Sequence, residues 1–289
     1  MKTKTEAKLY TAHTDTYHTE LCITRIGLCV SCIRGERALC ERLIRKMFTL
    51  TRRAHTQPVA VDKSWHQPKT ENMAKVIGVI QVKGGVGRST IATNMAGAMS
   101  EKNKTVLIDC DMPQGTSASW FSIRQQQNRA GKLTVVTARD HKELVKEVER
   151  LSADHQVVII DCPPRIAEMT RAALILSDLC LIPLGASAPE IWATSDLMTT
   201  IEEAKRVKSS VDARLVWNRY RSTTSSAQEL SAAVRTGLGL AEMNTKLGFR
   251  VAYSDALARG LTVMEWSDRA AKDEMTKLAI ETTKILKVR

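Results

Sequence analysis

A glycine-rich turn directly after an apolar run restricts the fold of this chain more than any other feature of its sequence. The run covers residues 76–82, and the turn that follows reads Lys83-Gly84-Gly85-Val86-Gly87-Arg88-Ser89-Thr90. A strand that ends in such a turn and then opens a helix aims backbone N–H groups and the helix N-terminus at one point. Phosphate oxygens suit that point, so the sequence predicts a phosphate-binding loop.

Two residues depart from the plain phosphate-loop pattern G-x-x-x-x-G-K-[ST]. Lys83 is an early, additional lysine, and Arg88 stands where a lysine normally reaches the β- and γ-phosphates. Arg88 keeps the positive charge, but a planar guanidinium differs in shape from a compact ammonium. We therefore expect an ATP hydrolase that binds its nucleotide and turns it over slowly. A purely structural glycine turn is the alternative.

Two further apolar runs end in aspartates. Residues 106–108 lead into Asp109-Cys110-Asp111, and residues 157–160 lead into Asp161 and two prolines. Alternation along a strand places Asp109 and Asp111 on the same side of its end, where they can hold hydrated Mg²⁺ and orient water. Asp161 fits the Walker B pattern. Either run alone is also compatible with an aspartate that only caps the next helix, but all three segments in this order predict an ATPase.

Together these motifs resemble the ParA/MinD family of ATPases, and the resemblance covers residues 73–289. The family's deviant Walker A motif, K-G-G-x-G-[KR]-[ST]-[ST], contains the early signature lysine. Residues 109–115 look like the D-x-D-P-Q-G segment of plasmid and chromosome partition ATPases, with Met112 as an extra residue. Residues 215–219 resemble the strand whose terminal asparagine reads adenine.

The resemblance implies a role for each matching residue. Lys83 would cross a dimer interface to the partner's nucleotide, and Asp111 would activate the attacking water. Mg²⁺ would be held by Ser89, Asp109 and Asp161. ATP would be bound by the loop and one distant side chain, namely Gly84, Gly85, Val86, Gly87, Arg88, Ser89, Thr90 and Asn218.

The resemblance also implies partners. The protein would form a homodimer on binding ATP, bind duplex DNA without sequence preference, and be released when a ParB-like centromere-binding protein stimulates hydrolysis. We expect it in the cytoplasm, on the nucleoid when ATP-bound, and not on a membrane. A net charge of +12 suits nucleic acid, acidic lipid or an acidic protein, and the resemblance selects DNA among these partners. The candidate DNA contacts are Arg219, Arg221, Arg235, Lys246 and Arg250. The alternatives are another cargo, or a scaffold or repressor with little hydrolysis.

Alternating apolar strands and helical stretches predict an α/β fold, a three-layer doubly wound sheet that is mostly parallel. The expected strands are 76–82, 105–109, 133–137, 157–161, 179–184 and 213–217. The expected helices are 89–102, 141–152, 166–176 and 189–208. Residues 275–289 predict a helix packed on the core, because acidic residues interrupt any basic membrane-binding face.

Residues 1–72 differ in kind from the ATPase-like domain at 73–289. They hold 13 Lys and Arg against 7 Asp and Glu, and four of the seven cysteines: Cys22, Cys29, Cys32 and Cys40. We expect a basic extension that is disordered, or a misassigned start with translation beginning at Met73. A zinc site on the four cysteines and a helix-turn-helix near residues 36–50 are the structured alternatives.

Overall fold

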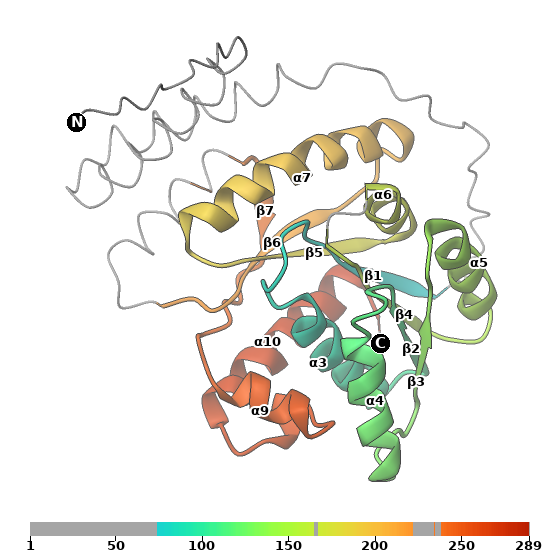
Figure 1. The fold of residues 1–289 in the computed structure, drawn as a ribbon, viewed down its shortest axis with the longest axis vertical. Coiled ribbons are helices and arrows are strands. Elements are labelled where there is room, and N and C mark those ends of the chain that lie inside the picture. Colours follow the sequence, from blue (N-terminus) through green and yellow to red (C-terminus); the bar gives the residue numbers. More distant parts are fainter. Residues whose placement is uncertain (1–73, 165–166, 222–233, 235–237, 289) are drawn as a thin grey trace, which may run out of the picture.

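The computed structural model describes residues 74–164, 167–221, 234 and 238–288 (Figure 1). It contains a seven-stranded sheet in the order β3-β2-β4-β1-β5-β6-β7, and every strand pairing is parallel. The strands are β1 (Lys75–Val79), β2 (Thr105–Asp109), β3 (Leu133–Thr137), β4 (Val157–Asp161), β5 (Leu179–Leu184), β6 (Ala213–Trp217) and β7 (Ala241–Glu242). The predictions for residues 1–72 and for Arg235 lie outside the described residues.

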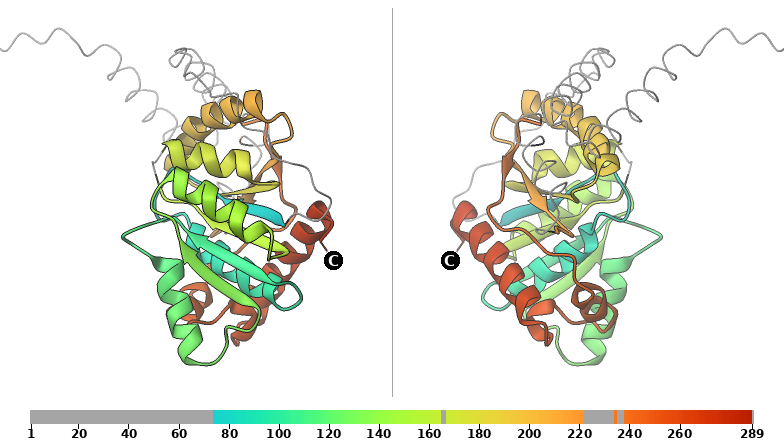
Figure 2. Two further views of the ribbon diagram at one scale, coloured as in Figure 1. Left: turned by 90° about the vertical axis from the view of Figure 1, so that its right-hand side faces the viewer. Right: turned by 90° about the vertical axis from the view of Figure 1, so that its left-hand side faces the viewer.

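Helices cover both faces of the sheet, which gives the expected three layers (Figures 1 and 2). One face carries α3 (Arg88–Ser100), α4 (Thr116–Gln126), α9 (Ala252–Ala258) and α10 (Arg269–Leu286). The other carries α5 (His141–Ser152), α6 (Ala167–Leu176) and α7 (Ala188–Val207). The predicted fold class is therefore confirmed.

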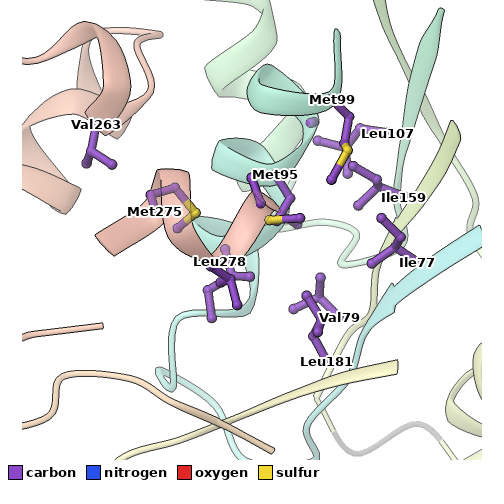
Figure 3. Packing of buried hydrophobic residues seen from close by; sticks show 14 of the residues in the cluster. Ile77, Val79, Met95, Met99, Leu107, Ile159, Leu181, Val263, Met275 and Leu278 are labelled. Atoms are coloured by element: carbon purple, nitrogen blue, oxygen red, sulfur yellow. The ribbon is translucent and has the colours of Figure 1, made fainter. Parts of the chain in front are cut away.

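Strands buried on both sides explain why their sequences are apolar throughout rather than alternating. Every residue of β2 and of β4 is buried. On one face of the sheet, Met95 of α3 lies between the strand side chains and Met275 and Leu278 of α10 (Figure 3). The core of that face thus joins the first helix after the glycine-rich turn to the last helix of the chain.

Most predicted boundaries agree with the structure. The bounds of β2, β3, β4, β5, β6 and α5 are those expected. The first strand was expected to reach residue 82 but ends at Val79. The cause is Gln81, whose side-chain Oε1 accepts a hydrogen bond from Val82 N (2.9 Å) and whose carbonyl binds Arg88, so the chain leaves the ladder there. Helices α3 and α7 start one residue earlier than expected, and α6 is described from Ala167 onward.

Within the described residues, four elements were not predicted: α4, β7, α9 and the 3₁₀ turn η1 (Val263–Glu265). Helix α4 shows why, since its sequence has three serines and a threonine and no clear apolar stripe. Its position is fixed by distant partners instead. Trp120 Nε1 donates to Leu261 O (3.0 Å), and the Arg124 guanidinium binds Glu265 of η1. Tertiary contacts here outweigh weak local preference.

The predicted C-terminal helix is confirmed as a helix packed on the core, although it begins earlier, at Arg269, where Asp268 Oδ1 caps Ala271 N (2.9 Å). Two of its acidic residues hold the preceding segment. Glu281 accepts the backbone amides of Asn244 and Thr245, and Glu274 accepts that of Gly248. Among the described helices, none combines the length and the apolar character needed to span a bilayer.

Candidate functional site

The glycine-rich turn lies where the winding of the sheet reverses. Strands β2, β3 and β4 stand on one side of β1, and β5, β6 and β7 stand on the other. Ligands of open parallel sheets bind outside the carboxyl ends of the strands at such a reversal. The carboxyl ends of β2 and β4 bring Asp109 and Asp161 there as direct register partners. The loop and both strand-end aspartates therefore meet at one site.

The turn needs glycine at its last position. Gly87 is the N-cap of α3 and has φ +93°, in the left-handed region. A Cβ at this position would lie 2.3 Å from Asn218 Nδ2, far inside any contact distance. The positive φ and the nearby Asn218 amide both disfavour a side chain at this position, so glycine is required there.

Arg88 is buried and binds the loop itself. Its Nη1 donates to the carbonyls of Gln81 (2.8 Å) and Lys83, and its Nη2 lies 3.8 Å from Asp111 Oδ2. Its Nε is buried without a hydrogen-bond partner among the described residues. Arg88 thus links the end of the loop to its start, and its buried Nε–H group remains available to a ligand.

Asp161 is fully buried and holds an unused acceptor. Its Oδ2 accepts a hydrogen bond from the Ser117 hydroxyl (2.7 Å), whereas Oδ1 accepts none from the described residues. Burial raises the pKa of Asp161 to about 7, although the Ser117 and Ser89 hydroxyls act in the opposite direction. A buried carboxylate oxygen without a donor is costly, and a cation would satisfy it.

Asp109 and Asp111 differ in their environment. Asp109 is buried, and its two oxygens accept the amides of Asp111 (3.0 Å) and Ala118 (2.9 Å), so it caps the first turn of α4. Its remaining lone pairs can still accept from water on an ion. Asp111 is about one-fifth exposed at the rim. Burial raises the pKa of Asp111, Arg88 opposes that change, and Asp109 adds to it.

The donor set fits ATP and Mg²⁺. An unused buried N–H on Arg88 suits an anion, and an unused buried oxygen on Asp161 suits a cation. Ser89 follows Arg88 directly and lies close enough to Asp161 to affect its pKa. Mg²⁺ is typically bound by one or two carboxylates, a hydroxyl, waters and substrate phosphates. The predicted ligands Ser89, Asp109 and Asp161 are therefore brought together.

The remaining predicted loop residues lie as follows. Gly84 and Gly85 are exposed, and Thr90 lies in the first turn of α3. The buried Val86 presents its carbonyl to Asn218 Nδ2 (2.7 Å). Lys83 is partly exposed, and its ammonium makes no hydrogen bond or ion pair with the described residues.

Asn218, expected to read adenine, also braces the loop. Besides its bond to the Val86 carbonyl, its Oδ1 accepts from Arg219 N (2.9 Å). This contact links the end of β6 to the glycine-rich turn. Adenine recognition by Asn218 stays a prediction.

The predicted DNA-contacting residues lie near one another but in different states. A parallel bridge between Tyr220 and Gly248 joins their two segments. Two of the arginines are in ion pairs, Arg219 with Glu190 and Arg250 with Glu274. The other two cations lie over aromatic rings, Arg221 over Phe249 (4.7 Å) and Lys246 over Tyr220 (4.3 Å).

Sequence reasoning missed two residues of the site, Ser117 and Gln81. Gln81 carried a usable signal, because it is a polar residue at the end of an apolar run. Its Nε2 donates to Pro183 O (3.2 Å) and to Thr194 Oγ1 (3.0 Å), which ties the base of the loop to α7. Ser117 carried no such signal, since its partner Asp161 is 44 residues away.

Three cysteines lie in or directly after strands of the sheet. Cys110 follows β2, Cys162 follows β4, and Cys180 lies in β5, and all three are buried free thiols. Burial raises the pKa of Cys162 and of Cys180 to about 12 and that of Cys110 well above its ordinary value. Protonated, buried thiols are unreactive, so they serve here as small packing groups.

A sequence profile decides the family. The profile described as ATPase MipZ matches residues 75–287. The chain belongs to the ATPase MipZ family. This match confirms the predicted ParA/MinD-type membership, and ATP and Mg²⁺ are the cofactors of such ATPases. Family members dimerise and interact with partner proteins.

This MipZ-family ATPase matches several known proteins over nearly the whole length of each of them. The maintenance of carboxysome distribution protein A of Halothiobacillus neapolitanus is 27% identical over 213 residues, which is 73% of this chain and 97% of that protein. The chromosome partitioning protein ParA of Caulobacter vibrioides is 26% identical over 255 residues, 73% of this chain and 94% of that protein. MinD of Pyrococcus horikoshii, solved with Mg-ADP, shares the fold with a TM-score of 0.56, 15% identity, and coverage of 74% of this chain and 98% of that one.

Proposed function

We propose that this MipZ-family ATPase is a nucleotide-dependent positioning switch for DNA or a cargo carried on DNA. It forms a homodimer with two ATP–Mg²⁺ at the interface and then binds duplex DNA without sequence preference. A ParB-like partner ends this state by stimulating hydrolysis. In this proposal the protein is cytoplasmic and joins the nucleoid only when ATP-bound.

Lys83 is the observation that carries the dimer proposal. Arg88 holds the carbonyl oxygen of Lys83, yet the Lys83 ammonium makes no hydrogen bond or ion pair within the described part of the chain. A cation at the rim of a phosphate site, not needed by its own loop, is suited to the nucleotide of a second copy. Such a charge stabilises negative charge developing in the transition state.

We propose one role in hydrolysis for each residue of the site. The 84–90 backbone and Arg88 would bind the phosphates, while Ser89, Asp109 and Asp161 would hold Mg²⁺. Asp111 at the rim would orient the attacking water. We expect slow turnover, because the Arg88 guanidinium is largely engaged by the loop carbonyls.

The contacts of the basic residues divide the DNA candidates. Arg219 and Arg250 are engaged by carboxylates, so they would release few counterions from DNA. The Lys246 ammonium lies over the Tyr220 ring, a contact that does not neutralise its charge. We therefore propose Lys246 as a phosphate contact.

Fluorescence anisotropy with random-sequence duplex DNA tests the proposal directly. The full chain is titrated with ATP–Mg²⁺, with ADP–Mg²⁺ and without nucleotide, each at two salt concentrations. Binding only with ATP, weakening with salt, is the expected result. Binding that ignores the nucleotide, or no binding, would refute the DNA-bound state.

Two variants locate the contact. Lys246→Ala should weaken binding and lower the salt slope by about one, for the one lost phosphate contact. Lys146→Ala, on the exposed side of α5, is the matched control and should change neither quantity. An equal effect of both changes would show that only net charge matters.

A second candidate changes the cargo and keeps the switch. The relative named for carboxysome distribution matches along 97% of its length, which favours positioning of a protein assembly as well as of DNA. Partner-stimulated turnover distinguishes both from a nucleotide-binding scaffold. Asp111→Ala should retain ATP binding and lose turnover, and equal turnover in variant and wild type would remove Asp111 from its role.

A further inference from the structure

Two successive residues of α4 hold the carboxylates at the ends of two neighbouring strands. Ser117, the second residue of the helix, is fully buried and donates its hydroxyl to Asp161 Oδ2 (2.7 Å). Its neighbour Ala118 donates its amide to Asp109 Oδ2 (2.9 Å). The first turn of α4 therefore contacts β2 through the backbone and β4 through a side chain.

The Ser117 hydroxyl distinguishes the two oxygens of Asp161. The terminal torsion of an aspartate is broad and roughly two-fold, so an unrestrained carboxylate can present either oxygen. With Oδ2 bound to Ser117, the oxygen left without a partner among the described residues is Oδ1. A hydrogen bond from outside the coordination shell that fixes a ligand in this way raises metal affinity.

We propose that Ser117 is a positioning residue of the Mg²⁺ site, which orients the Asp161 carboxylate so that Oδ1 faces the ion. Without the Ser117 hydroxyl, Asp161 Oδ2 would lose the hydrogen bond that fixes it, and the carboxylate would lose its fixed orientation. The inference rests on the assignment of Asp161 to Mg²⁺ and does not depend on DNA binding.

Nucleotide affinity with and without the ion tests this role. ADP binding to the full chain is measured by isothermal titration calorimetry in Mg²⁺ and in EDTA, and the ratio of the two affinities isolates the contribution of the ion. Ser117→Ala should lower that ratio about tenfold and leave the affinity in EDTA unchanged. A purely structural serine would lower both affinities together, so an unchanged ratio would overturn the proposal.

Matched variants separate the ion effect from folding. Ser119→Ala removes an exposed hydroxyl from the same helix and should leave the ratio as in the wild type. Ser117→Cys preserves volume but donates weakly, so it should shift the ratio in the same direction even if the alanine variant unfolds. A wild-type ratio near one would instead remove Asp161 from the Mg²⁺ site, which is a different failure.

Discussion

Arg88 shows at the scale of one residue how a substitution in a motif becomes a change in structure. The sequence establishes that a cation stands at this position, but not what it contacts. That depends on where the carbonyls of Gln81 and Lys83 lie, and both are within hydrogen-bond reach of one guanidinium nitrogen. The start of the loop is therefore hydrogen-bonded to the arginine at its end.

Replacing Arg88 by lysine should therefore lower ATP turnover instead of restoring a standard loop. A single ammonium cannot bind two loop carbonyls and also approach Asp111 as the planar fork does. The rate of phosphate release and the temperature of thermal unfolding should both decrease, because each buried carbonyl left unpaired costs about 1–3 kcal/mol of stability. Arg139→Lys, on an exposed pair beside α5, is the control. Faster turnover in Arg88→Lys would contradict this account.

Gly87→Ala should abolish nucleotide binding. The new Cβ would meet Asn218 Nδ2 at 2.3 Å, and the residue would be held at φ +93°. Strain of this kind costs about 1–3 kcal/mol, which urea unfolding measures. Gly84→Ala, where no atom lies within 4 Å of the added Cβ, is the matched control. Adding Asn218→Ala to Gly87→Ala should restore part of the stability, because it removes the clash and leaves the torsion.

At the scale of elements, α4 and η1 are fastened to each other by an ion pair between the buried Arg124 and the partly exposed Glu265. Arg124 donates to both oxygens of Glu265, and Glu265 also accepts the backbone amide and the hydroxyl of Thr262. Burial alone would raise the pKa of Glu265, but these hydrogen bonds outweigh burial and hold the pKa below its ordinary value.

The sign of this shift predicts an acid-sensitive contact. A carboxyl group whose pKa is lower in the folded state stabilises that state above its unfolded pKa, and the stability is lost as pH falls through the folded pKa. Glu265→Gln should reduce the free energy of unfolding at neutral pH by about 1–3 kcal/mol and flatten its decline below about pH 4.5. Urea titrations across this range provide the measurement. Glu149→Gln, exposed on α5, should behave as wild type.

The elements also show what the sequence can and cannot predict. Six strands and α5 follow from apolar runs and their breaks, because burial on both faces leaves a continuous signal. The positions of α4 and η1 depend on contacts between residues more than 100 positions apart, such as Trp120 with Leu261, and β7 is a two-residue strand that only its pairing with β6 defines. The strand-end aspartates were predictable because each directly follows an apolar run. Ser117 was not, because only its contact with Asp161, 44 residues away, places it in the site.

At the scale of the molecule, the first and last described elements, β1 and α10, pack into the same core. The core joins β1 to the last helix, and the family profile begins at residue 75. We therefore propose residues 73–289 as the ATPase unit and residues 1–72 as a separate basic extension.

The fragment 73–289 should unfold in one cooperative transition and bind ADP as tightly as the full chain. Calorimetry of the two proteins provides the comparison. A fragment that begins at Gln81, and so lacks the central strand β1, should not fold. Loss of ADP binding in 73–289 would make residues 1–72 part of the site.

The buried thiols make the opening of the central sheet measurable by chemical labelling. In the fragment 73–289 the cysteines are Cys110, Cys162 and Cys180, all sealed among β2, β4 and β5. A thiol reagent can reach them only during an opening, so the labelling half-time reports how often these strands part. ADP with Mg²⁺ should lengthen that half-time in proportion to its concentration over its dissociation constant. The labelling half-time of these three cysteines would thus measure how strongly a bound nucleotide suppresses opening of the sheet.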